Sequence, residues 1–414
     1  MSEISQLPLS GIRVVDHGHV WAGPLLGMSF RDMGAEVIKI QTPGTSSGVS
    51  MAGQGMPGTA TEQVDAHDQM NYHTLDRGKK SLTLNLKTPE GKEIYKRLIK
   101  LSDVVIENFS SRTMGSLGLA YKVLNELNPR IIMASLSATG SSPGPWKELV
   151  SYGPSLSALY GIKSLLGYQD SDQPVEDQAD LDPTAAGHAF LAILAALEMR
   201  EETGVGQHID MSQGESGIQR IAEPIMDFFF NGRVATTQGN RYPGIVPHGY
   251  FKTVGKDQWI ALTIRDNEEW RRFRDHFSEV MPKIEEKRFD SLNGRVTHQD
   301  DLEAIIENWT KSQDSWALTN RLQGIGIPAY PVMDAPALVG DENLNQLHRS
   351  HVDIGTENLD ENELFRGIVW KLAVGHGEIS DPTPISGQHN DQILQNLLKY
   401  NDDEVTNFRQ RGII

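Results

Sequence analysis

Short apolar runs typical of buried strands alternate with helix-like runs along the first half of the chain, which predicts an α/β fold. The strand-like runs are residues 12–16, 35–40, 81–86, 103–108 and 130–137. Helices are expected from Pro89 and at 121–127. Parallel strands need crossover connections, so this spacing indicates a doubly wound sheet. From residue 249 the pattern changes to an alternating hairpin, which indicates a smaller α+β domain.

The first strand is followed by the loop 17–24, HGHVWAGP, and by a helix that Pro24 opens and Gly34 ends. Open α/β sheets bind ligands at the carboxyl ends of their strands, so this loop is a candidate ligand site. It contains no GxGxxG motif, which argues against a dinucleotide. The next segment, Thr42 to Asn71, has no periodicity and is expected to be a lid or an insertion.

Basic residues gather near successive strand ends in a chain that is acidic overall: Arg77, Lys79, Lys80, Lys87 and Arg112. One interpretation is a solvated charged face, which is the usual role of such a cluster. The other is a groove for phosphates, which the position near strand exits favours. The sequence leaves both interpretations open.

The stretch 181–207, LDPTAAGHAFLAILAALEMREETGVGQ, is apolar nearly all round and poor in β-branched residues. It predicts a buried helix of about four to five turns. Asp182 is expected as its N-cap, Pro183 as its first residue and Gly204 as its terminator. Free N–H groups at a helix start favour an anion, and an ionised, poorly hydrated carboxylate there can attack an activated acyl group. An ordinary capping role for Asp182 is the alternative.

Beyond this helix, the sequence predicts a strand at 208–211, a helix at 214–230 and a hairpin at 249–264. Further helices are expected at 267–277, 298–311 and 315–324. The tail is expected to return with additional strands and helices.

The composition excludes several classes of site. The 414 residues carry a net charge of −17, which argues against nucleic acid and anionic membrane as partners. Cysteine is absent, so disulfides, thiolate metal sites and a cysteine nucleophile are excluded. The pair His17 and His19 lacks an accompanying HExxH or carboxylate-rich motif, so no metal is expected. No run of about 18 apolar residues and no signal-like start is present, and a cytoplasmic protein is expected.

Several segments are specific when taken together and in order: LPLSGIRVVDHGHVWAGPLLGMSFRDMGAEVIKIQTPG, RGKKSLTLNLKTPEGKEI, DVVIENFSSRTMGSLGL, REETGVGQHIDMS, and SGQHNDQILQNLL with RQRGII. Over nearly its whole length the chain resembles the family III CoA-transferases, the CaiB/BaiF type that includes formyl-CoA transferase, carnitine CoA-transferase and related acyl-CoA racemases. The resemblance implies a Rossmann-like large domain built from 1–225 and 331–414, a small α+β domain at 226–330, and an interlocked homodimer.

The resemblance also assigns roles to residues. Asp182 falls on the nucleophilic aspartate, and Val20, Trp21 and Ala22 fall on the loop that lines the thioester site. The expected contacts of CoA are Leu84, Lys87, Asn108 and Phe109, with Arg77, Lys80 and Arg112 as basic partners of its phosphates. The implied reaction moves CoA from an acyl-CoA donor to a carboxylic acid acceptor through aspartyl anhydride and aspartyl-CoA thioester intermediates. CoA is then a substrate, and no bound cofactor is expected. The N–H donors for the oxyanions are expected from the loop 20–23 or the helix start.

Two departures from the family pattern narrow the expected activity. Tyr152 stands where the racemases carry a catalytic histidine. Trp21 stands where the formyl-CoA transferase subgroup has glutamine, and YPGIVPHG at 242–249 replaces its Gly-rich loop. Formate or oxalate specificity is therefore not expected. Two alternatives stay open: an acyl-CoA racemase with Asp182 as its base, and a non-catalytic acyl-CoA-binding protein.

Overall fold

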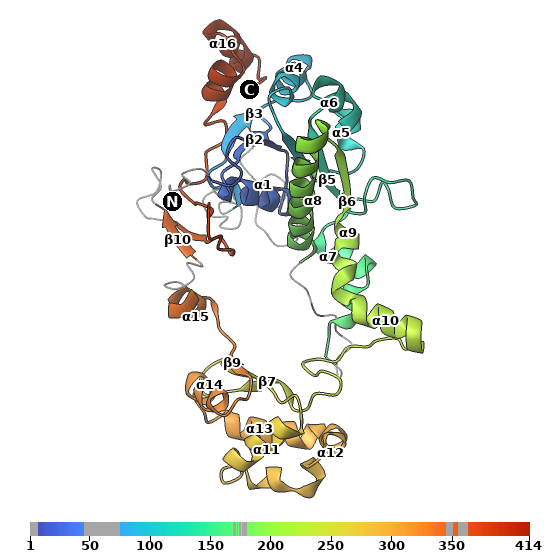
Figure 1. The fold of residues 1–414 in the computed structure, drawn as a ribbon, viewed down its shortest axis with the longest axis vertical. Helices are drawn as coiled ribbons and strands as arrows, with labels where there is room; N and C mark the ends of the chain where they lie inside the picture. Colours follow the sequence, from blue (N-terminus) through green and yellow to red (C-terminus); the bar gives the residue numbers. More distant parts are fainter. Residues whose placement is uncertain are drawn as a thin grey trace. The chain divides into compact units, whose positions relative to one another are not determined.

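The computed structural model describes residues 7–44, 75–168, 171, 173, 175, 180–344, 351–354 and 363–414. The chain forms two compact units (Figure 1), of which the first comprises 1–163, 176–232 and 343–414 and the second comprises 164–175 and 233–342. The expected division at 225 and 330 into a CoA-binding and a small domain stays a prediction. The expected lid, Thr42 to Asn71, lies almost entirely outside the described residues.

Six parallel strands form the sheet of the first unit, in the order β3-β2-β1-β4-β5-β6. Their bounds are Arg13–Asp16 (β1), Glu36–Gln41 (β2), Lys80–Thr83 (β3), Val104–Glu107 (β4), Ile132–Ser137 (β5) and His208–Ser212 (β6). This is the strand order of a Rossmann-type sheet, so the expected α/β class is confirmed. The order reverses between β1 and β4, and such sheets bind ligands in the crevice beyond that point.

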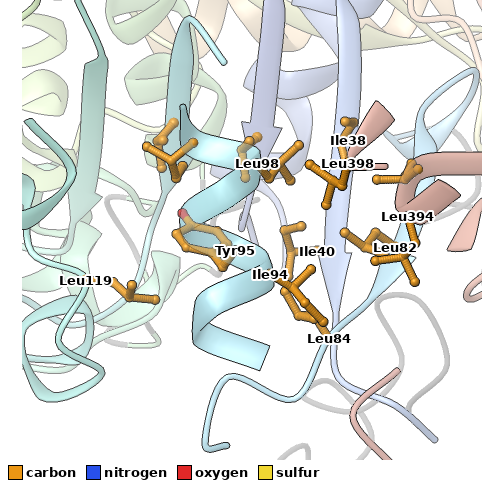
Figure 2. Packing of buried hydrophobic residues seen from close by; sticks show 14 of the residues in the cluster. Ile38, Ile40, Leu82, Leu84, Ile94, Tyr95, Leu98, Leu119, Leu394 and Leu398 are labelled. Carbon is orange, nitrogen blue, oxygen red and sulfur yellow. The ribbon is translucent and has the colours of Figure 1, made fainter. Parts of the chain in front are cut away.

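Helices cover both faces of this sheet, which is why its strands read as nearly continuous apolar runs. One face carries α1 (Ala22–Asp32) and α8 (Leu181–Thr203), and the other carries α4 (Pro89–Ile99) and α6 (Tyr121–Leu127). Val14 packs with the first pair and its neighbour Val15 with the second, because successive strand side chains point to opposite faces. Figure 2 shows the second layer, in which Tyr95 and Leu98 of α4 lie against the sheet.

The end of the chain returns to the first unit. Leu394 and Leu398 pack into the same hydrophobic cluster as α4 (Figure 2). The Asn390 side chain accepts the N–H of Thr83 at 2.9 Å and donates to the Thr83 hydroxyl at 2.7 Å. The elements of this return are β10 (His351–Ile354), β11 (Glu363–Arg366), the π-helix η7 (Gln392–Leu397) and α16 (Asp402–Gln410). Both ends of the chain therefore build the unit that holds the parallel sheet.

The second unit is an antiparallel sheet with helices around an aromatic core. Its strands are β7 (His248–Lys252), β8 (Trp259–Thr263) and β9 (Ala329–Pro331), in that order. Its helices are α11 (Asn267–Phe277), α12 (Leu292–Thr297), α13 (Gln299–Thr310), α14 (Ser315–Gly324) and α15 (Ala335–Gly340). Trp270, Phe273 and Phe277 are fully buried at its centre. The expected hairpin and the three helices after it are present.

Two helices differ from the sequence expectation. The helix expected at 214–230 is split into α9 (Gln213–Ile218) and α10 (Ala222–Asn231), because Pro224 has no N–H to continue the helical bonding. The helix α8 is not buried all round, since Leu191 is 68% exposed and Met199 is 51% exposed. Among the described residues, no helix combines the length and apolar character needed to cross a membrane.

Candidate active site

The loop between β1 and α1 has an unusually constrained backbone. Gly18 lies so close to Gly23 that a Cβ atom on Gly23 would be 2.4 Å from the Cα atom of Gly18. Between them, Val20 has a φ of 61°, a left-handed conformation that is sterically unfavourable for a β-branched residue. Trp21 is the N-cap of α1 but gives its first turn no side-chain hydrogen bond. The first N–H groups of α1 are therefore directed at acceptors outside the helix.

Asp182 supplies such an acceptor. Its carboxylate, half-buried, accepts a hydrogen bond from the backbone N–H of Ala22. The expectation that Asp182 caps α8 is wrong: Asp180 holds the N-cap position and the helix begins at Leu181, which makes Asp182 its second residue and Pro183 its third. The helix begins two residues earlier than the Asp-Pro pair suggests.

The protonation of Asp182 follows from this setting. Burial raises the pKa of the Asp182 carboxyl to about 6, although the N–H of Ala22 acts in the opposite direction. At pH 7 the ionised form then exceeds the protonated form by about ten to one. Asp182 is thus a mostly ionised carboxylate with less hydration than an ordinary surface aspartate, which suits a nucleophile.

A cavity of about 320 Å³ lies beside Asp182 at the carboxyl edge of the sheet. Its walls come from the loops that follow β1, β4, β5 and β6 and from the segment 149–153. The lining residues include His19, Val20, Asn108, Phe109, Ser110, Thr113, Tyr152 and Gln213. This is the position at which an open α/β sheet is expected to bind its ligand.

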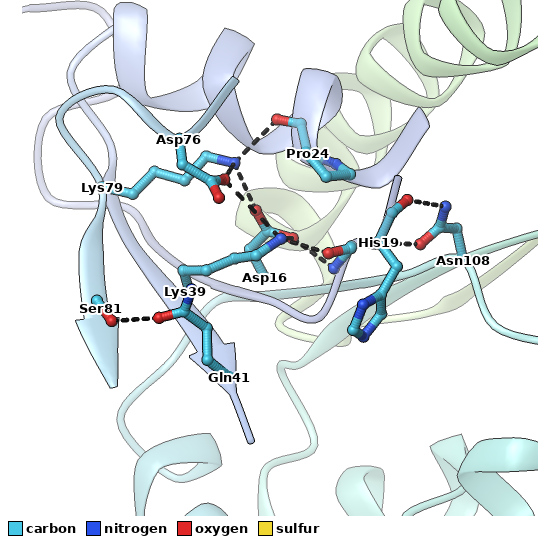
Figure 3. Close-up of polar contacts among 10 residues, drawn as sticks. Asp16, His19, Pro24, Lys39, Gln41, Asp76, Lys79, Ser81 and Asn108 are labelled. Atoms are coloured by element: carbon cyan, nitrogen blue, oxygen red, sulfur yellow. Dashed lines mark hydrogen bonds and ion pairs between the residues drawn. The ribbon is translucent and has the colours of Figure 1, made fainter. Parts of the chain in front are cut away.

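Asn108 connects two walls of the cavity. Its side-chain oxygen accepts the N–H of His19 at 2.7 Å, and its amide nitrogen donates to the carbonyl of His19 at 2.8 Å (Figure 3). The loop after β4 therefore holds the loop after β1 through both backbone groups of one residue. The Phe109 ring lies 5.0 Å from the His19 ring, which adds an aromatic contact between the same loops.

The structure brings four predicted site residues together in this cavity: Val20, Asn108, Phe109 and Asp182. Trp21 and Ala22 are next to them in the chain, and Ala22 contacts Asp182 through its N–H. Leu84 is placed differently. Its side chain is 1% exposed and belongs to the hydrophobic cluster under α4, so only its backbone can reach a ligand.

Two predicted phosphate partners lie elsewhere. Arg77 is 1% exposed and forms a two-pronged ion pair with Asp32, at 2.5 and 3.2 Å. Lys80 is the first residue of β3 and pairs at 2.6 Å with Glu36, the first residue of β2. The amino ends of these strands are opposite to the cavity, and both cations already have carboxylate partners. The placement of Arg77 and Lys80 does not fit phosphate binding at the cavity.

The other two basic candidates are exposed and follow carboxyl ends of strands. Lys87 comes four residues after β3, and its ammonium makes no ion pair within the described part of the chain. Arg112 follows β4 and pairs with Glu148 at 3.2 Å, with both side chains more than half exposed. An exposed pair of this kind exchanges partners easily, so Arg112 remains accessible to an anion.

Several cavity residues were not singled out from the sequence, among them His19, Ser110, Thr113 and Gln213. Their position in the sequence could have identified them, because each residue follows the carboxyl end of a predicted strand by a few residues. In the part of the chain that the structure describes, no cluster of three histidine or acidic side chains could hold a metal ion.

Comparison with known proteins gives the same family along most of the chain. The profile of CoA-transferase family III matches residues 9–390. The chain is 29% identical to the succinyl-CoA–L-malate CoA-transferase beta subunit of Chloroflexus aurantiacus, over 99% of this chain and 98% of the relative. It is also 29% identical to the succinate–glutarate CoA-transferase of Agrobacterium fabrum, over 94% and 96%.

Comparison with solved structures indicates the same family. The crystal structure of a CaiB/BaiF family protein from Brucella suis superposes with a TM-score of 0.82 at 26% identity, covering 95% of this chain and 100% of that one. The resemblance expected from the sequence motifs is thereby confirmed. This chain belongs to CoA-transferase family III and is an acyl-CoA:carboxylate CoA-transferase.

Proposed function

We propose that Asp182 is the nucleophile that carries the acyl group and then CoA during transfer. The observation that supports this is its placement: a half-buried, mostly ionised carboxylate faces a cavity and accepts the N–H of Ala22 from the first turn of a neighbouring helix. That N–H belongs to the first turn of α1, and an N–H at a helix start is a suitable donor to an oxyanion.

The proposed reaction begins when an Asp182 oxygen attacks the thioester carbonyl of the donor. The C–S bond breaks, CoA leaves as a thiolate, and an aspartyl-acyl anhydride remains. The thiolate then attacks the Asp182 carbonyl, which releases the donor acid as a carboxylate and leaves an aspartyl-CoA thioester. The acceptor carboxylate attacks this thioester, expels CoA as a thiolate and forms a second anhydride. Attack by the thiolate on the acceptor's carbonyl yields the new acyl-CoA and regenerates the Asp182 carboxylate. These four steps consume no proton, so the reaction requires no general acid.

We assign CoA contacts to Val20, Trp21, Ala22, Asn108 and Phe109, which line or adjoin the cavity. Lys87 and Arg112 are the proposed partners of the phosphates, since both are exposed cations beyond the carboxyl ends of strands. The names of the relatives concern succinyl-CoA with malate or glutarate, which makes a small dicarboxylic acid the first acceptor to try.

The proposed assembly is an interlocked homodimer, in the cytoplasm. Exposed apolar side chains on two helices support a large interface. On α8 these are Leu191 and Met199, which are 68% and 51% exposed, and on α10 they are Phe228, Phe229 and Phe230, which are 54 to 76% exposed. Monomers rarely leave so many large apolar residues uncovered on the helices of one unit. Sedimentation should show a dimer, and a monomer at micromolar concentration would contradict it.

The decisive experiment is covalent trapping. The protein is incubated with succinyl-CoA and then with hydroxylamine, which should convert the activated residue 182 to a hydroxamate that peptide mass spectrometry locates. Asp182→Asn should give no adduct and no transfer while still binding CoA. Transfer retained in Asp182→Asn would overturn the proposal. Uptake of deuterium at the α-carbon of an acyl-CoA, without any adduct, would indicate the racemase alternative instead.

A further inference from the structure

Four buried charged side chains meet beneath the loop that follows β1. Asp16 ends β1, Lys39 lies near the end of β2, and Asp76 and Lys79 precede β3 (Figure 3). Their side chains are between 0 and 7% exposed. We call these four residues the buried quartet. It contains two positive and two negative charges, so it is neutral as a unit.

Ion pairs connect the four side chains of the quartet to one another. The Lys79 ammonium donates to Asp16 at 2.7 Å and to Asp76 at 2.8 Å. The Lys39 ammonium lies 3.6 Å from Asp16 and 3.9 Å from Asp76. Burial alone would raise the pKa of Asp16, but the two lysines outweigh it and the pKa of Asp16 is lowered. The two lysines therefore favour the ionised form of Asp16.

Among the described residues, the other hydrogen bonds of the quartet side chains go to the backbone of the segment 18–24. Asp16 accepts the N–H of Gly18 at 2.6 Å, and the Lys39 ammonium donates to the carbonyl of Gly18. The Lys79 ammonium donates its third bond to the carbonyl of Pro24, at 2.9 Å. Both ends of the segment 18–24 are thus attached to buried ions, and Ala22, whose N–H contacts Asp182, lies between the attachments.

Helix α1 passes very close to this cluster. A Cβ atom on Gly27 would be 2.4 Å from a carboxylate oxygen of Asp16 and 3.1 Å from the ammonium nitrogen of Lys79. A buried ion pair contributes little net stability, because loss of hydration opposes the attraction of the charges. Stability alone does not account for a buried cluster of four ions in which Asp16, Lys39 and Lys79 bond to the backbone of one loop.

We propose that the buried quartet is a positioning device for the transfer reaction, which holds the segment 18–24 so that the N–H of Ala22 stays directed at Asp182. This rests on the proposed role of Asp182 as the nucleophile. None of the four quartet residues lines the cavity, so they act through the loop and do not touch the substrate.

The test is Lys39→Met, which removes the bond to the Gly18 carbonyl and keeps a side chain of similar length. We expect kcat to fall about 10- to 100-fold, since a loop displaced by about 1 Å misplaces the oxyanion donor. The dissociation constant for CoA should change less than about twofold, because the cavity walls that bind it are retained. Lys39→Arg keeps the charge and should restore part of kcat.

A matched control is Arg200→Met. Arg200 is 3% exposed and pairs with Asp103 at 3.0 Å, so it is an equally buried cation of the same unit, but its partner stands at the amino end of β4. This variant should lower the melting temperature and leave kcat of the folded protein unchanged. Equal kcat in Lys39→Met and Arg200→Met would overturn the positioning proposal.

If Lys39→Met does not fold, Gly27→Ala tests the positioning role instead. Its new methyl group displaces the ends of the Asp16 and Lys79 side chains without removing a charge, and kcat should fall in the same way with CoA affinity retained. Unchanged kcat in Gly27→Ala would overturn the proposal. Asp182→Asn is measured in parallel: full loss of transfer there, with normal kcat in the quartet variants, would refute only the positioning role.

Discussion

Replacing the proposed nucleophile should make the protein more stable at neutral pH. Burial raises the pKa of Asp182 from 3.8 to about 6, so the folded state binds the proton more tightly than the unfolded state. Wild-type stability therefore decreases as the pH rises from about 4 to 6 and stays lower above pH 6. A shift of about two units corresponds to about 3 kcal/mol, and about 2 kcal/mol allows for water at the open side of the cavity.

Asp182→Asn avoids this cost, because its neutral amide oxygen can still accept the N–H of Ala22. Urea unfolding followed by circular dichroism at pH 4, 5, 6, 7 and 8 measures the effect. The variant should match the wild type near pH 4 and exceed it by about 2–3 kcal/mol at pH 7. Asp180→Asn is the control: Asp180 is half exposed and pairs with Arg220 at 2.9 Å, so its loss should cost up to about 1 kcal/mol. A gain for Asp182→Asn that does not vary with pH would refute the reasoning.

Three further outcomes are expected. The kcat/KM for transfer should fall about tenfold per pH unit below about pH 6 and be level above pH 7, since the protonated Asp182 cannot attack; a pH-rate profile without this acidic limb would contradict it. Gly23→Ala should lower kcat by about 100-fold, because its Cβ atom meets the Gly18 backbone at 2.4 Å, whereas Gly115→Ala, with open space around it, should be neutral. Lys87→Ala should raise KM for acyl-CoA about two- to fivefold, make KM less dependent on salt concentration and leave kcat unchanged. An unaltered KM would show that Lys87 does not bind the phosphates.

The sequence was sufficient for the sheet and its binding edge, because these depend on local patterns. Apolar runs of four to six residues with helices between them predict parallel strands, and the carboxyl ends of parallel strands coincide at one edge. This placed the loop 17–24 at the binding edge, whereas the site roles of Val20, Asn108 and Asp182 came from the resemblance to the family. The break at Pro224 was also visible in the sequence, yet the apolar face around it favoured one long helix.

The basic cluster shows what a linear pattern cannot resolve. Arg77, Lys80 and Lys87 lie within eleven residues, but β3 runs between the last two. A strand rises about 3.3 Å per residue, so the three steps from Lys80 to Thr83 move the chain about 10 Å from the amino edge of the sheet toward the carboxyl edge. The sequence also does not show which carboxylate pairs with which cation. The partner of Arg77 is Asp32 and the partner of Lys80 is Glu36, and both precede the cluster by more than forty residues.

The buried quartet could be predicted from the sequence only in part. Lys39 interrupts the apolar run of β2, and a lysine in a strand covered on both faces requires an anionic partner. The register pairs Asp16 with Lys39 on adjacent strands, and both sit at the carboxyl end with their side chains on the same face as Val14 and Val37. An ion pair at this point therefore follows from strand pattern alone. The strand pattern does not predict what this ion pair supports, because the bonds to the carbonyls of Gly18 and Pro24 depend on the conformation of the loop, in which Val20 is left-handed. The loop geometry converts a buried ion pair, which by itself adds little stability, into a support for the N–H donor that faces Asp182.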